Sequence, residues 1–140
     1  MIRKMQNADL NTVADIWLDT NISAHNFISK QYWNENFEIV KEMLLQAEVY
    51  VYEDKNEIQA FIGLSDNYVA GIFVCSDAQS SGIGKQLLDF VKSIKKQLTL
   101  SVYQKNTQAI KFYQREKFTI QSEKIDEETG EKEYMMVCGE

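Results

Sequence analysis

The 140-residue chain contains no proline, a single histidine, His25, and only two cysteines, Cys75 and Cys138. Two cysteines this far apart are too few for a disulfide framework or a four-ligand zinc site, and one histidine indicates no metal site. No apolar run approaches the roughly 20 residues that a membrane-spanning helix needs. The N-terminal segment also lacks the apolar core of a signal peptide. We therefore expect a cytoplasmic protein with neither a metal nor a membrane partner.

Positive charge is also scarce, since 15 Lys and Arg stand against 21 Asp and Glu, a net charge of −6. A nucleic-acid partner requires a basic face that neutralises phosphates, so the composition argues against one. The acidic balance is compatible with a cationic amine substrate, although acidic surfaces mostly serve solubility. The length predicts one domain, residues 1–140, large enough to bury a core.

The most informative stretch is 71–90, with the sequence GIFVCSDAQSSGIGKQLLDF. It predicts the end of a buried strand, a small polar loop, and a helix that begins at Gly82-Ile83-Gly84. Such a turn directs backbone N–H groups and the positive end of a helix dipole at one spot, which favours anions and phosphates above all. The glycines allow a diphosphate to approach the backbone without meeting a Cβ atom.

Two other phosphate-binding motifs are excluded. A dinucleotide fingerprint needs a third glycine three residues after Gly84, where the sequence has leucine. A P-loop needs serine or threonine after its lysine, but Lys85 is followed by Gln86. What remains is Q-x-x-G-x-G, formed by Gln79, Gly82 and Gly84. Taken alone, this pattern is also that of a tight strand-to-helix turn that binds nothing.

The pattern resembles the acyl-CoA loop of the GNAT N-acetyltransferase superfamily. A second segment, Asn106-x-x-Ala109-x-x-Phe112-Tyr113-x-x-x-x-Phe118, is similar to that family's asparagine and short helix with an aromatic pair. The two motifs occur in the right order and span 71–118. The chain is also similar to small bacterial single-domain enzymes of this family with a His-x-Phe acceptor loop. The resemblance implies an α/β (α+β) fold. It would have a mixed, mostly antiparallel sheet of about six to seven strands, helices on both faces, and a splay between the fourth and fifth strands.

Hydrophobic periodicity predicts the elements individually. Strands are expected at Ile2–Met5, Val49–Tyr52, Ile58–Leu64, Tyr68–Val74 and Leu98–Tyr103, from Phe118, and through Met135–Val137 after an acidic turn at Asp126–Gly130. Helices are expected through Val13–Trp17 with a cap at Asn7 or Asp9, from a Ser29 cap to Leu44, over Gly82–Lys96 with Ile94 inward, and over Thr107–Arg115.

The resemblance also implies a binding site for acetyl-CoA as cosubstrate. It assigns backbone contacts with the pantetheine arm to Ile72, Phe73 and Val74, and pyrophosphate contacts to Gln79, Ser80, Ser81, Gly82, Ile83 and Gly84, with Lys85 adjacent and Asn106 helping to hold the cofactor. The sequence departs from the family at Gln79, where arginine is commoner, and at Ser76, where proline is frequent. Because glutamine brings no positive charge, binding would depend on the backbone amides.

The implied reaction is attack of an amine on the thioester, which requires removal of a proton from the amine and a donor for the departing thiolate. Tyr113 stands where the family often places that donor, although it could simply pack beside Phe112. His25 is the only side chain whose unperturbed pKa suits a base. It lies in the expected acceptor loop with Phe27 and Tyr32, which we expect to contact substrate.

The identity of the base stays open at this stage. A lone histidine is more often structural, and a water chain ending on backbone carbonyls would leave no trace in the sequence. Glu57, at the start of a strand, is a weaker candidate that most often would be a solvated turn residue. Cys75 has no basic neighbour that would lower its pKa, which favours a passive role.

The sequence therefore predicts an N-acetyltransferase that acts on a primary amine of a small molecule or peptide by direct attack in a ternary complex. One alternative is a non-catalytic acyl-CoA-binding sensor or regulatory module, and another is an interaction protein that uses the fold alone. The sequence does not identify the amine or the acyl chain. It is compatible with a monomer or a homodimer.

Overall fold

The computed structural model describes residues 1–139, which form a seven-stranded sheet with the order β1-β2-β3-β4-β5-β7-β6. All neighbouring strands are antiparallel except β4 and β5, which are parallel. The strands are β1 (Ile2–Lys4), β2 (Glu48–Asp54), β3 (Glu57–Ser65), β4 (Tyr68–Val74), β5 (Gln97–Tyr103), β6 (Thr119–Ile125) and β7 (Lys132–Gly139). The mixed, mostly antiparallel sheet predicted from the sequence is confirmed.

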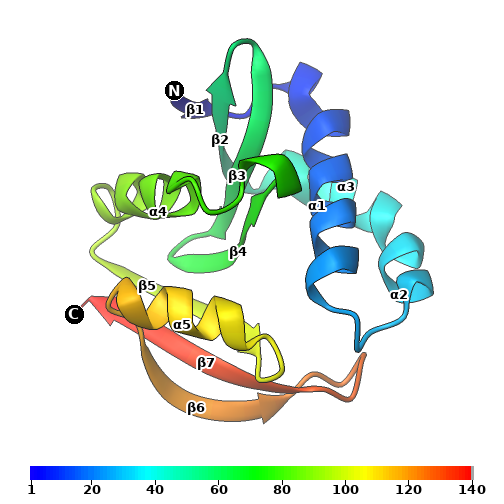
Figure 1. Cartoon of the computed structure of the whole chain (residues 1–140), viewed down its shortest axis with the longest axis vertical. Helices are drawn as coiled ribbons and strands as arrows, with labels where there is room; N and C mark the ends of the chain where they lie inside the picture. Colours follow the sequence, from blue (N-terminus) through cyan, green and yellow to red (C-terminus); the bar gives the residue numbers. More distant parts are fainter. Residues whose placement is uncertain (140) are drawn as a thin grey trace.

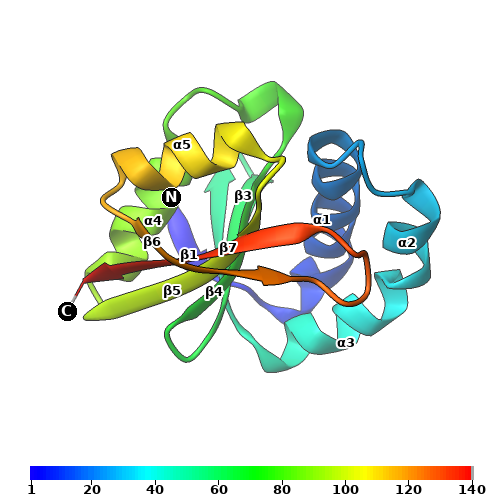
Figure 2. The same ribbon diagram turned by 90° about the horizontal axis from the view of Figure 1, so that it is seen from below.

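Helices cover both faces of this sheet (Figures 1 and 2). One face carries α1 (Leu10–Ala24), α2 (Lys30–Glu35) and α3 (Phe37–Gln46), and the other carries α4 (Ile83–Lys92) and α5 (Thr107–Arg115). Two short 3₁₀ turns, η1 (Asn7–Asp9) and η2 (Ser76–Ala78), precede α1 and α4. In the described part of the chain, no helix is long and apolar enough to cross a membrane.

Two apolar cores follow from the alternation of side chains across the sheet. On β4, Ile72 and Val74 pack with the core beneath α4 and α5, where Leu87 and Leu88 are fully buried. Phe73 points the other way, into the core beneath α1 and α3, and stacks on Phe61 with ring centroids 4.8 Å apart. β4 therefore has apolar contacts on both of its faces.

The sheet opens between β4 and β5 because the two strands pair only at their first residues. The ladder joins Tyr68 to Thr99 and Val69 to Leu100 and goes no further. On its other side, β4 shifts register against β3, since Gly71 faces Gly63 while Val69 already faces Leu64. The one extra residue on β4 forms a bulge, which bends a strand and increases its twist. The bend turns the rest of β4 away from β5, as Figure 1 shows.

The α2–α3 region differs from the single helix expected between Ser29 and Leu44. Ser29 does cap α2, since its Oγ accepts a hydrogen bond from the N–H of Tyr32 at 3.3 Å. The helix then breaks at Asn36, whose side-chain amide donates to the carbonyl of Tyr32 at 2.7 Å. Asparagine side chains compete in this way for carbonyls that continue a helix. Two short helices result.

The helix α4 is also shorter than expected, because it ends at Lys92 and not at Lys96. Ser93 donates both its N–H and its hydroxyl to the carbonyl of Phe90, which tightens the last turn. The expectation that Ile94 points inward is wrong, since its side chain is 49% exposed. By contrast, α5 and β4 have the bounds that the sequence predicted.

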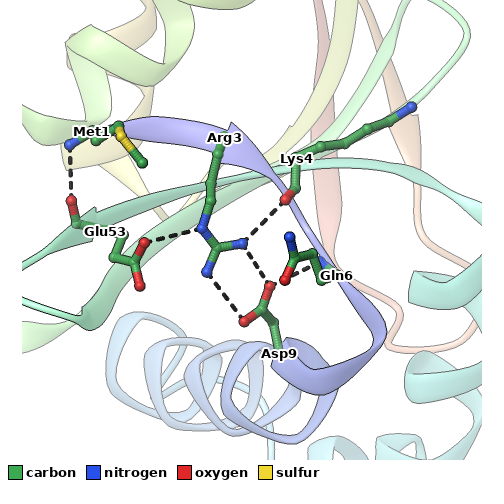
Figure 3. A network of polar contacts seen from close by, with 6 residues as sticks. All are labelled: Met1, Arg3, Lys4, Gln6, Asp9 and Glu53. Atoms are coloured by element: carbon green, nitrogen blue, oxygen red, sulfur yellow. Dashed lines mark hydrogen bonds and ion pairs between the residues drawn. The ribbon is translucent and has the colours of Figure 1, made fainter.

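A polar network fastens the N-terminal strand to its neighbours (Figure 3). The guanidinium of Arg3 donates to both carboxylate oxygens of Asp9, at 2.8 and 3.2 Å, and its Nε donates to Glu53 at 3.0 Å. Asp9 also accepts from the N–H of Gln6 at 2.8 Å, which caps η1. One arginine thus connects β1, β2 and the turn that leads into α1.

Candidate active site

A cleft of about 760 Å³ runs through the splay and is lined by residues from elements on both faces of the sheet. Its first half is formed by the η2–α4 loop and α5, and its second half by the end of α1 with the His25 loop, and by β5 and β7. Twelve of the residues predicted to form the site line it. They are His25, Ile72, Phe73, Val74, Gln79, Ser80, Gly82, Ile83, Gly84, Lys85, Asn106 and Tyr113.

The free edge of β4 presents backbone groups along one wall of this cleft. The N–H of Cys75 donates to the carbonyl of Gln59 on β3 at 2.9 Å. Since backbone groups alternate sides along a strand, those of Ile72 and Val74 point away from β3 and into the splay. The backbone groups of Phe73 point toward β3, so this residue contributes its side chain to the cleft. An extended amide-bearing ligand could pair with the free edge as an added strand would.

The beginning of α4 supplies a second set of free donors. Gly82 has a φ of +85° and precedes the helix, and the first helical bond runs from the N–H of Gln86 to the carbonyl of Gly82 at 3.1 Å. Within residues 1–139, the N–H groups of Ile83, Gly84 and Lys85 have no protein acceptor. Together with the helix dipole, they form a site that favours a diphosphate.

The loop before α4 is held by its own side chains. Gln79 donates its side-chain amide to the carbonyl of Val74 at 3.0 Å, and Ser81 donates its hydroxyl to the carbonyl of Ala78. Ser80 has a φ of +64°, so its backbone turns sharply at this point. The side chain of Gln79 therefore stabilises the conformation of the loop. Ser81, which the sequence predicted as a pyrophosphate contact, does not line the cleft.

Lys85 lies at the mouth of the cleft and is the basic side chain nearest the free N–H groups in sequence. Its ammonium pairs with Asp89 at 3.2 Å and with Glu116 at 3.1 Å. Hydrogen bonds to these two carboxylates, first of all to Glu116, raise the pKa of Lys85. Its positive charge is therefore already shared with two acids.

Tyr113 combines burial with a free hydroxyl. The residue is only 8% exposed, lines the cleft, and packs edge-on against Phe112 and Phe118. Its hydroxyl forms no hydrogen bond with any described residue. Burial, with a smaller effect of Tyr68, raises the pKa of this phenol well above its usual range. Tyr113 thus keeps its proton at neutral pH and can donate it to a group in the cleft.

Asn106 and His25 meet across the cleft. The Oδ1 of Asn106 accepts from the N–H of Ala109 at 3.2 Å and caps α5, which leaves its amide N–H₂ for His25 Nε2 at 3.2 Å. Nε2 must then accept, so the ring is neutral and carries its proton on Nδ1. Nδ1 is buried without a partner among the described residues, and burial lowers the pKa of His25.

The two other residues expected at the acceptor loop lie beside the cleft and do not line it. Phe27 packs edge-on against His25, with ring centroids 5.6 Å apart, and against Tyr103 at 5.7 Å. Tyr32 donates its hydroxyl to Glu128 in the β6–β7 turn at 2.7 Å. Phe27 thus packs against two residues that line the cleft, and Tyr32 packs against a third, Trp33.

Several cleft residues could not have been found in the sequence. Tyr103 and Glu133 lie opposite each other on β5 and β7, and Trp33 reaches the cleft from α2. Tyr103 and Glu133 belong to no motif, because their proximity to the other cleft residues depends on the tertiary fold, whereas Trp33 directly follows Tyr32 in the expected acceptor segment. Glu57 begins β3 opposite Asp54 and does not line the cleft.

Neither a metal nor a cysteine nucleophile is supported by the geometry. Within residues 1–139, no group of three His, Cys, Asp or Glu is arranged to hold a metal ion. Burial raises the pKa of the Cys75 thiol, as do Asp77 and Asp19, so the reactive thiolate is disfavoured. A second hollow of about 830 Å³ lies between α3 and the β3–β4 hairpin, and it contains no residue of the glycine loop or of α5.

Comparison with known proteins assigns the family. Residues 46–120 match the model of the family described as "Acetyltransferase (GNAT) domain". The chain belongs to the GNAT acetyltransferase family. It is similar to the peptidyl-lysine N-acetyltransferase YiaC of Escherichia coli, with 34% identity over 122 residues that cover 86% of this chain and 84% of that protein. It is also 29% identical to the peptidyl-lysine N-acetyltransferase YjaB of Salmonella typhimurium, over 85% of this chain and 83% of that one.

Solved structures share the fold over the whole chain. The apo-form solution structure of YjaB from Escherichia coli has a TM-score of 0.87 with 23% identity, covering 100% of this chain and 98% of that one. The structure of yncA from Salmonella typhimurium with its cofactor acetyl-CoA has a TM-score of 0.69 with 16% identity, covering 99% and 92%. The GNAT protein described here is an acetyl-CoA-dependent acetyltransferase. The free β4 edge and the free N–H groups of α4 fit this cosubstrate.

Proposed function

We propose that this protein transfers the acetyl group of acetyl-CoA to a primary amine by direct attack in a ternary complex, with a lysine side chain of a peptide as the favoured acceptor. The observation that carries the proposal is the cleft, which is lined by elements from both faces of the sheet at the point where β4 leaves β5. A cosubstrate held by the η2–α4 loop and an acceptor held beside the His25 loop would therefore meet in the splay. The lysine acceptor is favoured because YiaC and YjaB are named peptidyl-lysine N-acetyltransferases.

Acetyl-CoA would be bound mainly by backbone groups, in the half of the cleft formed by the η2–α4 loop and α5. The exposed N–H groups of Ile72 and Val74 hold the pantetheine arm, and the N–H groups of Ile83, Gly84 and Lys85 hold the diphosphate. Gln79 is uncharged and donates to the carbonyl of Val74, and the charge of Lys85 is shared with Asp89 and Glu116, so neither side chain adds much free positive charge. Affinity therefore depends on the geometry of the loop.

Tyr113 serves as the acid in this proposal. The amine nitrogen bonds to the carbonyl carbon of the thioester, and the bond from that carbon to sulfur breaks. The departing sulfur takes the phenolic proton of Tyr113, which is recovered from the nitrogen as the amide forms. A buried hydroxyl that lines the cleft suits this role because it is protonated before the reaction and has no competing partner.

Asn106 and His25 hold the acceptor side of the cleft in place through their hydrogen bond. The lone pair of His25 Nε2 is engaged by the amide of Asn106, so this nitrogen is not available to take a proton from a substrate while the bond lasts. We assign His25 the role of fixing the acceptor loop against the start of α5. The proton acceptor is then another group.

The test is to incubate the protein with acetyl-CoA and an N-terminally blocked peptide that contains one lysine. We expect thiol release together with acetylation of the lysine, measured by mass spectrometry, and neither with a peptide in which arginine replaces the lysine. Binding of acetyl-CoA without thiol release on any amine would instead support an acyl-CoA sensor. Failure to bind acetyl-CoA would support an interaction protein that uses the fold alone.

A further inference from the structure

Glu133 is the carboxylate that faces the second half of the cleft, beside the His25 loop, where the amine acceptor would bind. We call this part the acceptor half. The described lining contains two carboxylates, Glu116 and Glu133. Glu116 is held by Lys85 at 3.1 Å on the side of α4 and α5. On β7, Met136 is buried in the core beneath α4 and α5, so by alternation Glu133 points to the opposite face, where the end of α1 and the His25 loop lie.

The position of Glu133 is fixed by two neighbouring strands. It lies opposite Tyr103 on β5 and opposite Lys124 on β6. Directly opposed side chains on a sheet lie about 5 Å apart at Cβ, so Glu133 is beside Tyr103, whose ring is 5.1 Å from that of His25. Glu133 therefore lies next to the loop that forms the acceptor wall.

The carboxylate of Glu133 is partly buried and hardly bonded. Its side chain is 14% exposed, and its one ion pair, with Lys124, is long at 3.9 Å. No described donor forms a hydrogen bond with it. Buried carboxylates are costly without hydrogen-bonded partners, so an oxygen left free in a cleft is suited to a cationic ligand.

We infer that Glu133 binds the protonated amine of the acceptor and takes the proton that the nitrogen must lose before it attacks. The ammonium N–H bond breaks and the proton goes to a carboxylate oxygen, which leaves a neutral amine and a carboxylic acid. The acid later returns this proton to water. The inference rests on the proposed function, because it names the group that prepares the amine for that reaction.

The groups around Glu133 are consistent with this role. Burial is the main cause that raises the pKa of Glu133, Lys124 opposes the effect, and Asp126 in the β6–β7 turn adds to it. Tyr103 donates its hydroxyl to Asp126 at 2.8 Å, Tyr32 donates to Glu128, and His25 is neutral, so none of the three neutralises Glu133. A carboxylate with a raised pKa is a better proton acceptor for an amine.

The test compares Glu133→Gln with Glu131→Gln, a matched change of an acid that pairs with Lys105 just before β7 and lies outside the cleft lining. For a lysine peptide near pH 7, we expect kcat/KM of Glu133→Gln to fall by about 10²–10⁴-fold, with the affinity for acetyl-CoA unchanged. The deficit should shrink above about pH 9, where more of the amine is neutral in solution. Glu133→Asp should restore part of the rate.

Two outcomes would overturn the inference. One is a kcat/KM for Glu133→Gln equal to that of Glu131→Gln at every pH. The other is a change in KM alone with an unaltered pH profile, since a residue that takes the proton must shift that profile. If the wild-type protein acetylates no lysine peptide, the proposed function fails separately. In that case, Nα-acetyl-lysine amide is titrated into the acetyl-CoA-loaded wild type and into Glu133→Gln. Equal affinities of the two proteins for this amine would overturn the role of Glu133.

Discussion

The side-chain amide of Asn106 donates to Nε2 of His25 across 3.2 Å, which ties the start of α5 to the loop between α1 and α2. The two residues are 81 positions apart in the chain, and the bond spans the acceptor side of the cleft. Because Oδ1 of Asn106 already caps α5, the direction of this hydrogen bond is fixed and so is the neutral state of the ring.

Replacement of Asn106 by aspartate should raise the pKa of His25. The carboxylate can still cap α5 through the N–H of Ala109, but it now presents an acceptor to Nε2 and favours the protonated ring. His25 is the single histidine in the chain, so its ring protons can be followed without ambiguity in an NMR titration. Asn106→Ser, which keeps a capping oxygen without a charge, is the control. An unchanged pKa in Asn106→Asp would show that the two residues do not interact in solution.

Changes at Gly84 should separate the size of the side chain from its charge. A Cβ at this position would meet the ring of Phe112 at 3.5 Å and Ile72 at 3.9 Å, which are ordinary contacts. We therefore expect Gly84→Ala to bind acetyl-CoA nearly as the wild type does. Gly84→Glu places a negative charge and a long side chain at the free N–H groups, and its affinity should fall at least about tenfold, a cost of about 1.4 kcal/mol. Isothermal titration calorimetry measures both, and equal affinities would argue against a diphosphate at this turn.

Removal of the Tyr113 hydroxyl should affect the reaction far more than stability. The hydroxyl has no protein partner in the described structure, so Tyr113→Phe loses no hydrogen bond and should change the free energy of unfolding by less than about 1 kcal/mol. The value of kcat should fall by about 10²-fold or more, while the affinity for acetyl-CoA stays the same. Phe112→Leu, which alters the neighbouring ring, controls for packing. A Tyr113→Phe enzyme with normal kcat would remove this residue from the acid role.

The Arg3 network predicts a pH-dependent contribution to stability. The hydrogen bond from Arg3 is the largest cause that lowers the pKa of Asp9. A carboxylate with a lowered folded pKa stabilises the fold above its unfolded pKa of about 3.9, and this contribution is lost as the pH falls through the folded value. We expect Arg3→Ala to lower the free energy of unfolding by about 1 kcal/mol at pH 7 and to weaken this pH dependence.

Arg3→Lys is the matched control for that prediction. Lysine keeps the charge but cannot donate to both oxygens of Asp9 and to Glu53 at once, so we expect an intermediate loss. Chemical denaturation at pH 7 and near pH 3 would measure these differences. If both variants unfold as the wild type does at each pH, the network makes no net contribution.

The order of the elements and the cosubstrate half of the cleft could be predicted from the sequence. Glycine spacing and apolar periodicity act over a few residues, so they predicted β4, the α4 turn and α5 directly. Local signals failed where two of them competed. At Asn36 the side chain interrupts a helix whose apolar spacing continues, and at Ser93 the helix ends although Ile94 keeps the pattern.

Apart from His25, the acceptor half was decided by the tertiary structure. Glu133 and Tyr103 belong to no motif, and they become neighbours only because β7 inserts between β5 and β6. Burial of Tyr113 and the bond from Asn106 to His25 likewise depend on packing between distant segments. A sequence determines short-range geometry through backbone sterics and side-chain type. The pKa of a side chain and its partners depend on the solvent and charges around it, which exist only once the sheet has formed.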